Sequence, residues 1–168
     1  MLKKYELTTD TKIHLGHKLY RIKALRDFGN VKAGELGGYI EKEENLGHDG
    51  NAWVHENAWV CENAEVCGNA VVRGNAWVHE NAVVRGNADY LCIKGLGSYS
   101  RNTTFYKTKD GGVSVVCGCF NGTLDEFAAK VKNTHKNSKY AREYLAAVEV
   151  VKIHFELEDK DNGKRKNI

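Results

Sequence analysis

A six-residue repeat over residues 51–88 constrains the fold of this chain more than any other feature. It reads NAWVHE, NAWVCE, NAEVCG, NAVVRG, NAWVHE and NAVVRG, followed by a final Asn-Ala. An α-helix cannot keep a six-residue period on one face, whereas side chains two residues apart on a β-strand point the same way. The Ala and Val of each unit are therefore predicted to face inward, in a mainly β fold.

Three units are expected to form one triangular coil, in which residues 18 apart stack at the strand spacing of ~4.8 Å. Small Ala allows a tight corner, and Asn and Gly tolerate the positive φ that corners need. The units resemble those of hexapeptide-repeat proteins, and this resemblance implies a short left-handed parallel β-helix. Ile40 and Leu46 extend the pattern backwards, with a two-residue insertion near His48, so the predicted β-helix spans residues 37–88.

The large aromatic side chains of the repeat fall between inward positions and are expected to point outward. Trp59 and Trp77 are 18 residues apart, and Tyr39 lies beneath Trp59 once the insertion is counted. Stacked external aromatics are typical of protein interfaces. Tyr39, Trp53, Trp59 and Trp77 are therefore predicted to form the interface of a homo-oligomer, with a trimer favoured. Two alternatives stay open, namely coverage by the chain's own terminal segments and contact with a ligand or foreign partner.

The segments on either side of the repeat do not share its period. Residues 1–36 are predicted to cap its lower end, with a strand over 18–26 that carries basic residues on one face. Residues 89–157 are predicted to form a small α+β unit that ends in a helix, and 158–168 a disordered tail. Within the α+β unit, strands are expected at 90–93, 103–108 and 113–117, a helix after the capping box at Thr123, and a second helix from about Ser138 to Phe155.

Bulk properties exclude several classes of protein. The net charge of +3 is too small to indicate nucleic-acid binding, and no apolar run is long enough to span a bilayer. The start of the chain lacks the apolar stretch of a signal peptide. The five cysteines are odd in number and show no disulfide framework. A cytosolic protein with reduced thiols is therefore expected.

Residues 95–104 form the segment most typical of a binding site. They follow a strand and are rich in glycine, hydroxyl and amide groups that could hold a phosphate or carboxylate. No Gly-Lys-Ser/Thr ends the segment and it opens no helix, so it is neither a Walker loop nor a dinucleotide loop. The predicted ligand-binding residues are Ser98, Ser100, Arg101, Asn102, Thr103, Thr104 and Lys107, joined in an oligomer by Arg21 or Arg26. The alternative is an ordinary connecting loop.

Cysteine and histidine pairs give no sufficient pattern for metal binding or catalysis. Cys117 and Cys119 would share one face of a strand, but a structural zinc site needs four ligands, so no metal and no cofactor is predicted. His55 and His79 occupy outward positions. Hexapeptide-repeat acyltransferases use a histidine as general base, but they have more coils and a long excursion loop. Both histidines are therefore interpreted as solvated, and no catalytic residue and no enzymatic activity is predicted.

Segments outside and within the repeat resemble a group of bacteriophage and prophage proteins whose members have similar ends and differ in the number of units. The segments that carry the resemblance are 20–28, 37–41, 45–46 and 118–127, together with the units themselves. The resemblance implies a phage protein and carries over no catalytic residue. The hypothesis is a non-enzymatic counter-defence protein that sequesters a nucleotide immune signal or blocks a host defence protein. The alternatives are a hexapeptide-repeat acyltransferase and a structural or assembly protein.

Overall fold

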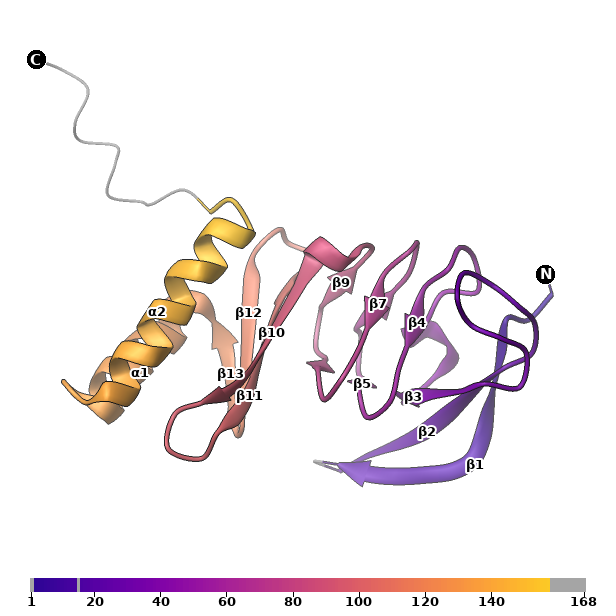
Figure 1. Cartoon of the computed structure of the whole chain (residues 1–168), viewed down its shortest axis with the longest axis horizontal. Coiled ribbons are helices and arrows are strands. Elements are labelled where there is room, and N and C mark those ends of the chain that lie inside the picture. Colours follow the sequence, from indigo (N-terminus) through magenta and orange to yellow (C-terminus); the bar gives the residue numbers. More distant parts are fainter. Residues whose placement is uncertain (1, 15, 158–168) are drawn as a thin grey trace, which may run out of the picture.

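The computed structural model describes residues 2–14 and 16–157, which form a mainly β chain with two helices near its C-terminal end. Three parts follow one another along the long axis of the molecule (Figure 1): an N-terminal hairpin, the repeat region, and a sheet covered by helices. The tail predicted to be disordered, 158–168, lies outside the described residues. Within the described range, no helix combines the length and the apolar character needed to cross a membrane.

The repeat region, residues 37–88, forms the predicted inward-facing stacks of Ala and Val. Each two-residue strand pairs in parallel with the strand 18 residues further on, β4 with β7, β5 with β8 and β6 with β9. The Ala and Val of all six units are buried, as the period-two argument predicts. The strands are β4 (Trp53–Val54), β5 (Trp59–Val60), β6 (Glu65–Val66), β7 (Val71–Val72), β8 (Trp77–Val78) and β9 (Val83–Val84).

The pattern continues below the regular units, as predicted. Strand β3 (Leu36–Ile40) pairs in parallel with β5 and places Ile40 beside Val60. A further parallel bridge joins Leu46 to Val66. Both partners are two residues further apart than in the regular units, so the two-residue insertion is confirmed. The short 3-10 helix η1 (Glu43–Asn45) lies between Ile40 and Leu46.

The corners of the coils use the sixth residue of the unit and not the first. Glu56, Glu62 and Glu80 have φ between 54° and 59°, and Gly68 and Gly74 have similar values. The expectation that Asn would adopt positive φ is therefore wrong for the described units. A left-handed conformation is costly for glutamate, and contacts of the glutamate carboxylates, described below, offset part of that cost.

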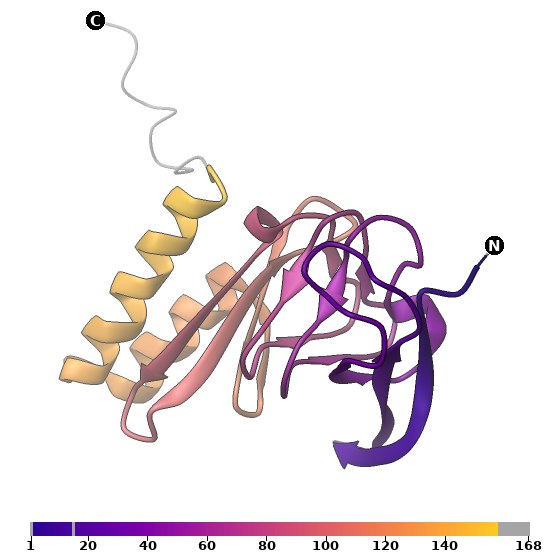
Figure 2. The same ribbon diagram turned by 45° about the vertical axis from the view of Figure 1, so that its right-hand side comes forward.

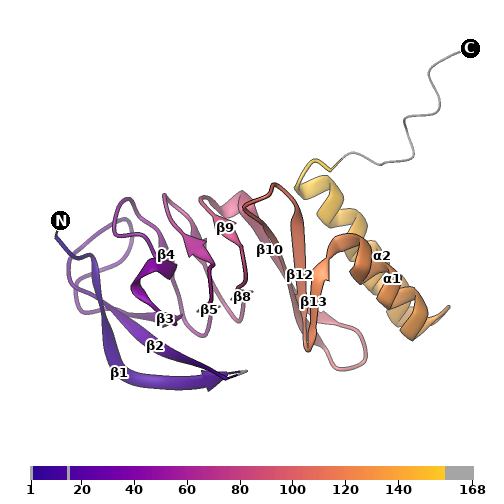
Figure 3. The same cartoon turned by 180° about the vertical axis from the view of Figure 1, so that it is seen from behind.

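The N-terminal cap is a hairpin that extends the mixed sheet of the repeat region. Strand β1 (Tyr5–His14) pairs antiparallel with β2 (His17–Ala24), and β2 pairs antiparallel with β3. The sheet order is β1-β2-β3-β5-β8. The hairpin curves beneath the coils in two opposite views (Figures 1 and 3). Sequence analysis predicts β2 but not β1, because β1 exposes most of its side chains and has no clear alternation.

The cap buries two of the aromatic residues that were expected at an oligomer interface. Trp53 is fully buried, with its ring centroid 5.3 Å from that of Phe28 and 6.3 Å from that of Tyr5. Tyr39 is also buried, and the Nζ of Lys12 lies 4.2 Å from its ring centroid. The interface prediction is therefore wrong for Trp53 and Tyr39, because segments far away in sequence cover them.

The C-terminal part places a four-stranded antiparallel sheet between the last coil and two helices (Figure 2). Tyr106 and Val116 on one face join the core of the repeat region, whereas Phe105 and Val115 on the other face pack against the helices. The 3-10 helix η2 (Asn87–Asp89) leads into the sheet. The elements are β10 (Tyr90–Leu96), β11 (Arg101–Lys107), β12 (Val113–Cys117), β13 (Phe120–Thr123), α1 (Leu124–His135) and α2 (Lys139–His154).

Both helices begin where local signals predict. The Thr123 hydroxyl accepts a hydrogen bond from the Glu126 backbone N–H, and the Thr123 backbone N–H donates to the Glu126 carboxylate, which completes the capping box. Ser138 caps α2 by accepting from the Ala141 backbone N–H. Strand β13 is absent from the sequence expectations, since four residues that include a glycine carry no strand signal.

Candidate ligand-binding site

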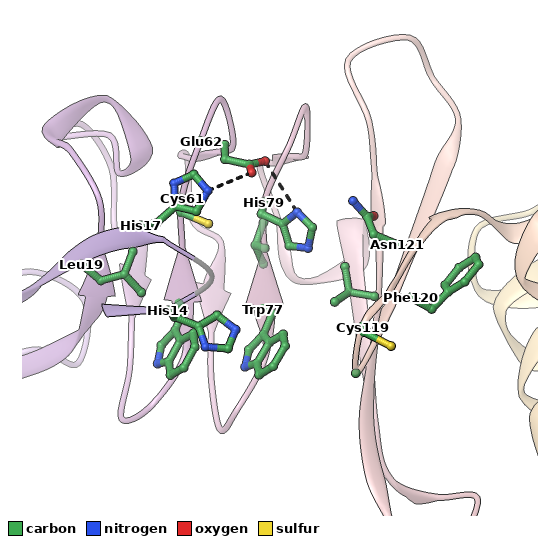
Figure 4. Close-up of a pocket in the computed structure, with 14 residues that line it drawn as sticks. His14, His17, Leu19, Cys61, Glu62, Trp77, His79, Cys119, Phe120 and Asn121 are labelled. Atoms are coloured by element: carbon green, nitrogen blue, oxygen red, sulfur yellow. Dashed lines mark ion pairs between the residues drawn. The ribbon is translucent and has the colours of Figure 1, made fainter. Parts of the chain in front are cut away.

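A cleft of about 280 Å³ lies where the three parts of the chain meet (Figure 4). The tip of the β1–β2 hairpin forms one wall, and the turn between β12 and β13 forms the opposite wall. The outer face of the coils between them forms the floor. The side chains of the walls and floor that matter for its chemistry are His14, His17, Trp59, Cys61, Glu62, Trp77, His79, Cys119 and Asn121.

Aromatic rings form the apolar part of the floor. Trp59 and Trp77 stack with ring centroids 5.3 Å apart and an interplanar angle of 4°. Tyr39 pairs with Trp59 and Trp59 with Trp77, so the predicted register of these three residues, here called the aromatic ladder, is confirmed, with ring stacking between the two tryptophans. The His14 ring lies edge-on to both tryptophans, at 4.2 and 4.6 Å. Burial lowers the pKa of His14, so this imidazole is neutral near pH 7.

A column of carboxylates runs up the polar side of the floor. The backbone N–H of Glu62 donates to Glu41 at 2.6 Å, and that of Glu80 donates to Glu62 at 2.7 Å. The Asn121 side-chain amide donates to Glu80. This column of Glu41, Glu62 and Glu80, the glutamate column, therefore connects one coil to the next and reaches β13. At the left-handed corner of Glu62, the carboxylate accepts a hydrogen bond from the backbone N–H of the next corner, at Glu80.

Two histidines contact the glutamate column from different parts of the chain. His17 Nδ1 lies 2.9 Å from Glu41 Oε1, and Nε2 lies 3.3 Å from Glu62 Oε1. The hydrogen bond with Glu41 raises the pKa of His17. Burial opposes ionisation of Glu41, but hydrogen bonds from His17 and the Glu62 backbone outweigh it and lower the pKa of Glu41. When His17 is protonated, an ion pair therefore joins the hairpin to the coils.

The side chain of His79 lines the cleft and is half-buried, so it is not a solvated residue. Its side chain is 15% exposed, and Nδ1 lies 3.7 Å from Glu62 Oε2. Burial lowers the pKa of His79 although Glu62 opposes the shift. The side chain of His55 is only 23% exposed. The interpretation of both histidines as solvated is therefore wrong, because the cap and the C-terminal sheet pack against the outer faces of the coils.

The cysteines near the cleft are poor nucleophiles or metal ligands as arranged. Burial raises the pKa of Cys61 to about 12, so it is a thiol at pH 7. Cys117 ends β12 and is buried, where its sulfur accepts a hydrogen bond from Thr103 Oγ1 at 3.2 Å. Cys119 lies beyond the strand end and is exposed, so the expectation that the two share one strand face is wrong. The described part of the chain contains no cluster of three or more His, Cys, Asp or Glu suited to a metal ion.

The segment 95–104 is mostly strand, and three of the predicted ligand residues, Thr103, Thr104 and Lys107, make contacts within the chain. Thr103 and Thr104 are buried in β11, and Thr104 Oγ1 accepts a hydrogen bond from the Trp77 backbone N–H at 3.3 Å. Lys107 forms an ion pair with Asp89 at 3.1 Å. Polar groups of these side chains are therefore already paired with other groups of the chain. Ser98 and Ser100 are exposed in the turn between β10 and β11.

Arg21 and Arg26, which were predicted to join the ligand site in an oligomer, lie in the N-terminal cap. Arg21 Nε donates to the Gly37 carbonyl at 3.2 Å, and Arg26 Nη2 donates to the His48 carbonyl at 3.5 Å. Strand β11, which begins at Arg101, lies beyond the last coil (Figure 1). One chain therefore does not bring Arg21 or Arg26 to Arg101, and their meeting in an oligomer stays a prediction.

Three of the predicted ligand residues, Arg101, Asn102 and Thr104, line a cavity that adjoins the cleft. This second cavity measures about 130 Å³ and shares Trp77, Val116 and Gly118 with the larger one. Asn75 completes its polar lining. Sequence analysis does not predict Trp77, His79 or Asn75 as ligand residues. The 18-residue spacing of Trp59 and Trp77 is the signal that marks this face, but the covering walls come from distant segments.

Comparison of the chain with models of known protein families gives no match, and comparison with curated proteins gives none either. The function is therefore argued from the geometry of the cleft.

Proposed function

We propose that this chain is a non-enzymatic binding protein that holds a small ligand in the cleft. The observation that carries the proposal is the meeting of hairpin, coils and C-terminal sheet around a concave site with two partly exposed tryptophans in its floor. Small-molecule sites are typically apolar clefts of ~300–1,000 Å³ with a few convergent polar groups. A volume of about 280 Å³ lies just below that range and therefore fits a small ligand.

We propose further that the repeat region is a left-handed parallel β-helix. The parallel pairing of strands 18 residues apart and the left-handed corner residues support this geometry. A homotrimer stays part of the proposal, although Tyr39 and Trp53 cannot contribute to its interface because they are buried within one chain. Light scattering tests the oligomer, since a monomeric mass would exclude it.

The proposed biological role is phage counter-defence in the host cytoplasm, and it rests on the sequence resemblance alone. Of the two mechanisms considered, a concave aromatic site supports sequestration of a small nucleotide signal better than it supports blocking of a protein. A protein partner would bury about 800 Å² on its side of a typical interface, most of it on surface outside a cleft of about 280 Å³.

The test uses a variant that fills the cleft. Cys119 is exposed on its wall, so Cys119→Trp is expected to weaken binding at least about 10-fold by occupying the space of the ligand. Cys119→Ser is the matched control and should bind normally. Calorimetry against a panel of cyclic and linear nucleotides is the measurement. Absence of binding by the unmodified protein would overturn small-ligand sequestration and favour the protein-blocking mechanism.

A second candidate function is acyl transfer, which one observation favours. His79 is neutral near pH 7, and its Nδ1 faces Glu62, as in a general base that a carboxylate orients. Acetyl-CoA turnover with a panel of amines and hydroxyl compounds is the assay. Turnover that is lost in His79→Gln, or in His55→Ala, would replace the binding proposal with this one.

A further inference from the structure

We propose that the ligand is an anion attached to a planar aromatic ring. The ring stacks on the free face of Trp77 as the next step of the aromatic ladder, and Arg101 pairs with the anionic group. This inference rests on the proposed binding function and names the chemical class and the position of the ligand.

The aromatic ladder ends at Trp77 with one face unmatched. Trp59 stacks on the other face. The cavity of about 130 Å³ is lined by Trp77 but not by Trp59, so it lies on the side of Trp77 away from the ladder. The element beyond β8 is β11, whose Thr104 accepts a hydrogen bond from the Trp77 backbone N–H, and no other residue that lines this cavity is aromatic. The chain therefore supplies no ring for the next step, and a planar ligand ring could continue the stack at the usual centroid distance of ~4.5–7 Å.

Arg101 supplies a positive charge at the same cavity. Its guanidinium carbon lies 5.1 Å from the centroid of the exposed Tyr99 ring. Among the residues that the structure describes, Arg101 forms no ion pair with a carboxylate. The side-chain amides of Asn75 and Asn102 line the cavity beside it. A guanidinium with two neighbouring amides is suited to a phosphate or carboxylate group.

Gly118 leaves room for the Arg101 side chain beside the cavity. A Cβ atom at residue 118 would lie 1.6 Å from Arg101 Nη1, and φ is +62°. Only glycine therefore allows the guanidinium to lie against the β12–β13 turn while the backbone adopts this conformation.

The glutamate column determines which way the ligand points. Glu62 lines the larger cleft, and Glu80 follows it in the column. Negative charge on that side repels an anion, whereas Arg101 attracts one on the other side of Trp77. The anionic group is therefore directed to the Arg101 cavity, and uncharged parts of the ligand extend toward His79 and Asn121 in the larger cleft.

Calorimetry on the full chain with AMP, adenosine and ribose 5-phosphate separates the two contacts. AMP is expected to bind more tightly than either partial ligand. Arg101→Gln should weaken AMP about 10- to 100-fold and leave adenosine unchanged. Trp77→Leu should weaken both AMP and adenosine at least about 5-fold, because stacking contributes to both. Arg85→Gln, at an exposed arginine outside both cavities, is the matched control and should change nothing.

The possible results distinguish failure of this inference from failure of the proposed binding function. Adenosine binding as tightly as AMP would overturn the role of Arg101, and ribose 5-phosphate binding as tightly would overturn the stacked ring. In both cases the cleft remains a ligand site. AMP binding that survives both substitutions also overturns the inference, because the ligand then lies elsewhere. If none of the three compounds binds, the ligand class is wrong, and the nucleotide panel with Cys119→Trp decides whether the cleft binds any nucleotide.

Discussion

Trp53, Trp59 and Trp77 occupy the same position of their units but have different environments. Trp53 is fully buried beneath the cap, whereas Trp59 and Trp77 are partly exposed at the cleft. The difference arises because β4 pairs with β7, while β5 and β8 belong to another face of the coils. The cap does not share the period of the repeat, so equivalent residues on different faces meet different neighbours.

Replacement of Trp53 should therefore affect stability. Trp53→Ala removes a buried side chain between Phe28 and Tyr5 and is expected to cost about 3–5 kcal/mol of the free energy of unfolding, measured by urea denaturation. Tyr99→Ala, at a residue 79% exposed, is the control and should stay within about 0.5 kcal/mol. A cost below about 1 kcal/mol for Trp53→Ala would show that the cap does not bury this side chain in solution.

The β1–β2 hairpin is joined to the coils by contacts whose strength depends on pH. His17 faces Glu41 and Glu62 on the coils, while His14 of the same hairpin and His79 also line the cleft. The pKa of His17 is raised above its ordinary value of 6.5, and burial lowers those of His14 and His79. Acidification therefore strengthens one contact of the hairpin and opposes burial of the other two imidazoles.

His17→Gln should destabilise the protein in acid and not in base. A raised pKa in the folded state contributes stability that is fully present below the unfolded pKa and is lost as the pH rises through the folded pKa. Urea denaturation at about pH 5.5 and about pH 8.5 measures the difference between the variant and the parent. His55→Gln is the control with the opposite sign, because burial lowers the pKa of His55. Equal effects of His17→Gln at both pH values would contradict the ion pair.

The cleft depends on the number of coils, because its walls belong to the two ends of the molecule. One coil more would move the hairpin away from the β12–β13 turn by about one strand spacing, ~4.8 Å. The aromatic ladder and the glutamate column would both gain a step in register, since their members pair across the coils. The coil number therefore controls the width of the cleft separately from the stability of the fold.

Duplication of residues 57–74 is expected to keep a cooperative fold and to abolish nucleotide binding by widening the cleft. Duplication of residues 69–74 alone is the control. It adds one unit, separates Trp59 from Trp77 in register and should lower the thermal midpoint by breaking their stack. Circular dichroism and calorimetry are the measurements. Equal stability of the two insertions would contradict the 18-residue coil.

Local patterns in the sequence were sufficient to predict the inward Ala and Val positions, the insertion, the aromatic ladder and the helix starts at Thr123 and Ser138. Each depends on residues close in sequence or on a period that repeats unchanged, so the physics of a strand or a helix end determines it. The sequence also marks Arg101 and Asn102 as candidate ligand residues, because their chemistry is visible without neighbours.

Only the tertiary structure decided which faces of the coils are covered. The burial of Trp53 depends on Tyr5 and Phe28, and that of Thr103 and Thr104 depends on how β11 packs. The cleft needs His17, His79 and Cys119 together, and no local pattern relates these three. The segments that cover an outward face of the coils do not share the six-residue repeat. Which faces are covered is therefore determined by packing across the whole chain and not by the repeat itself.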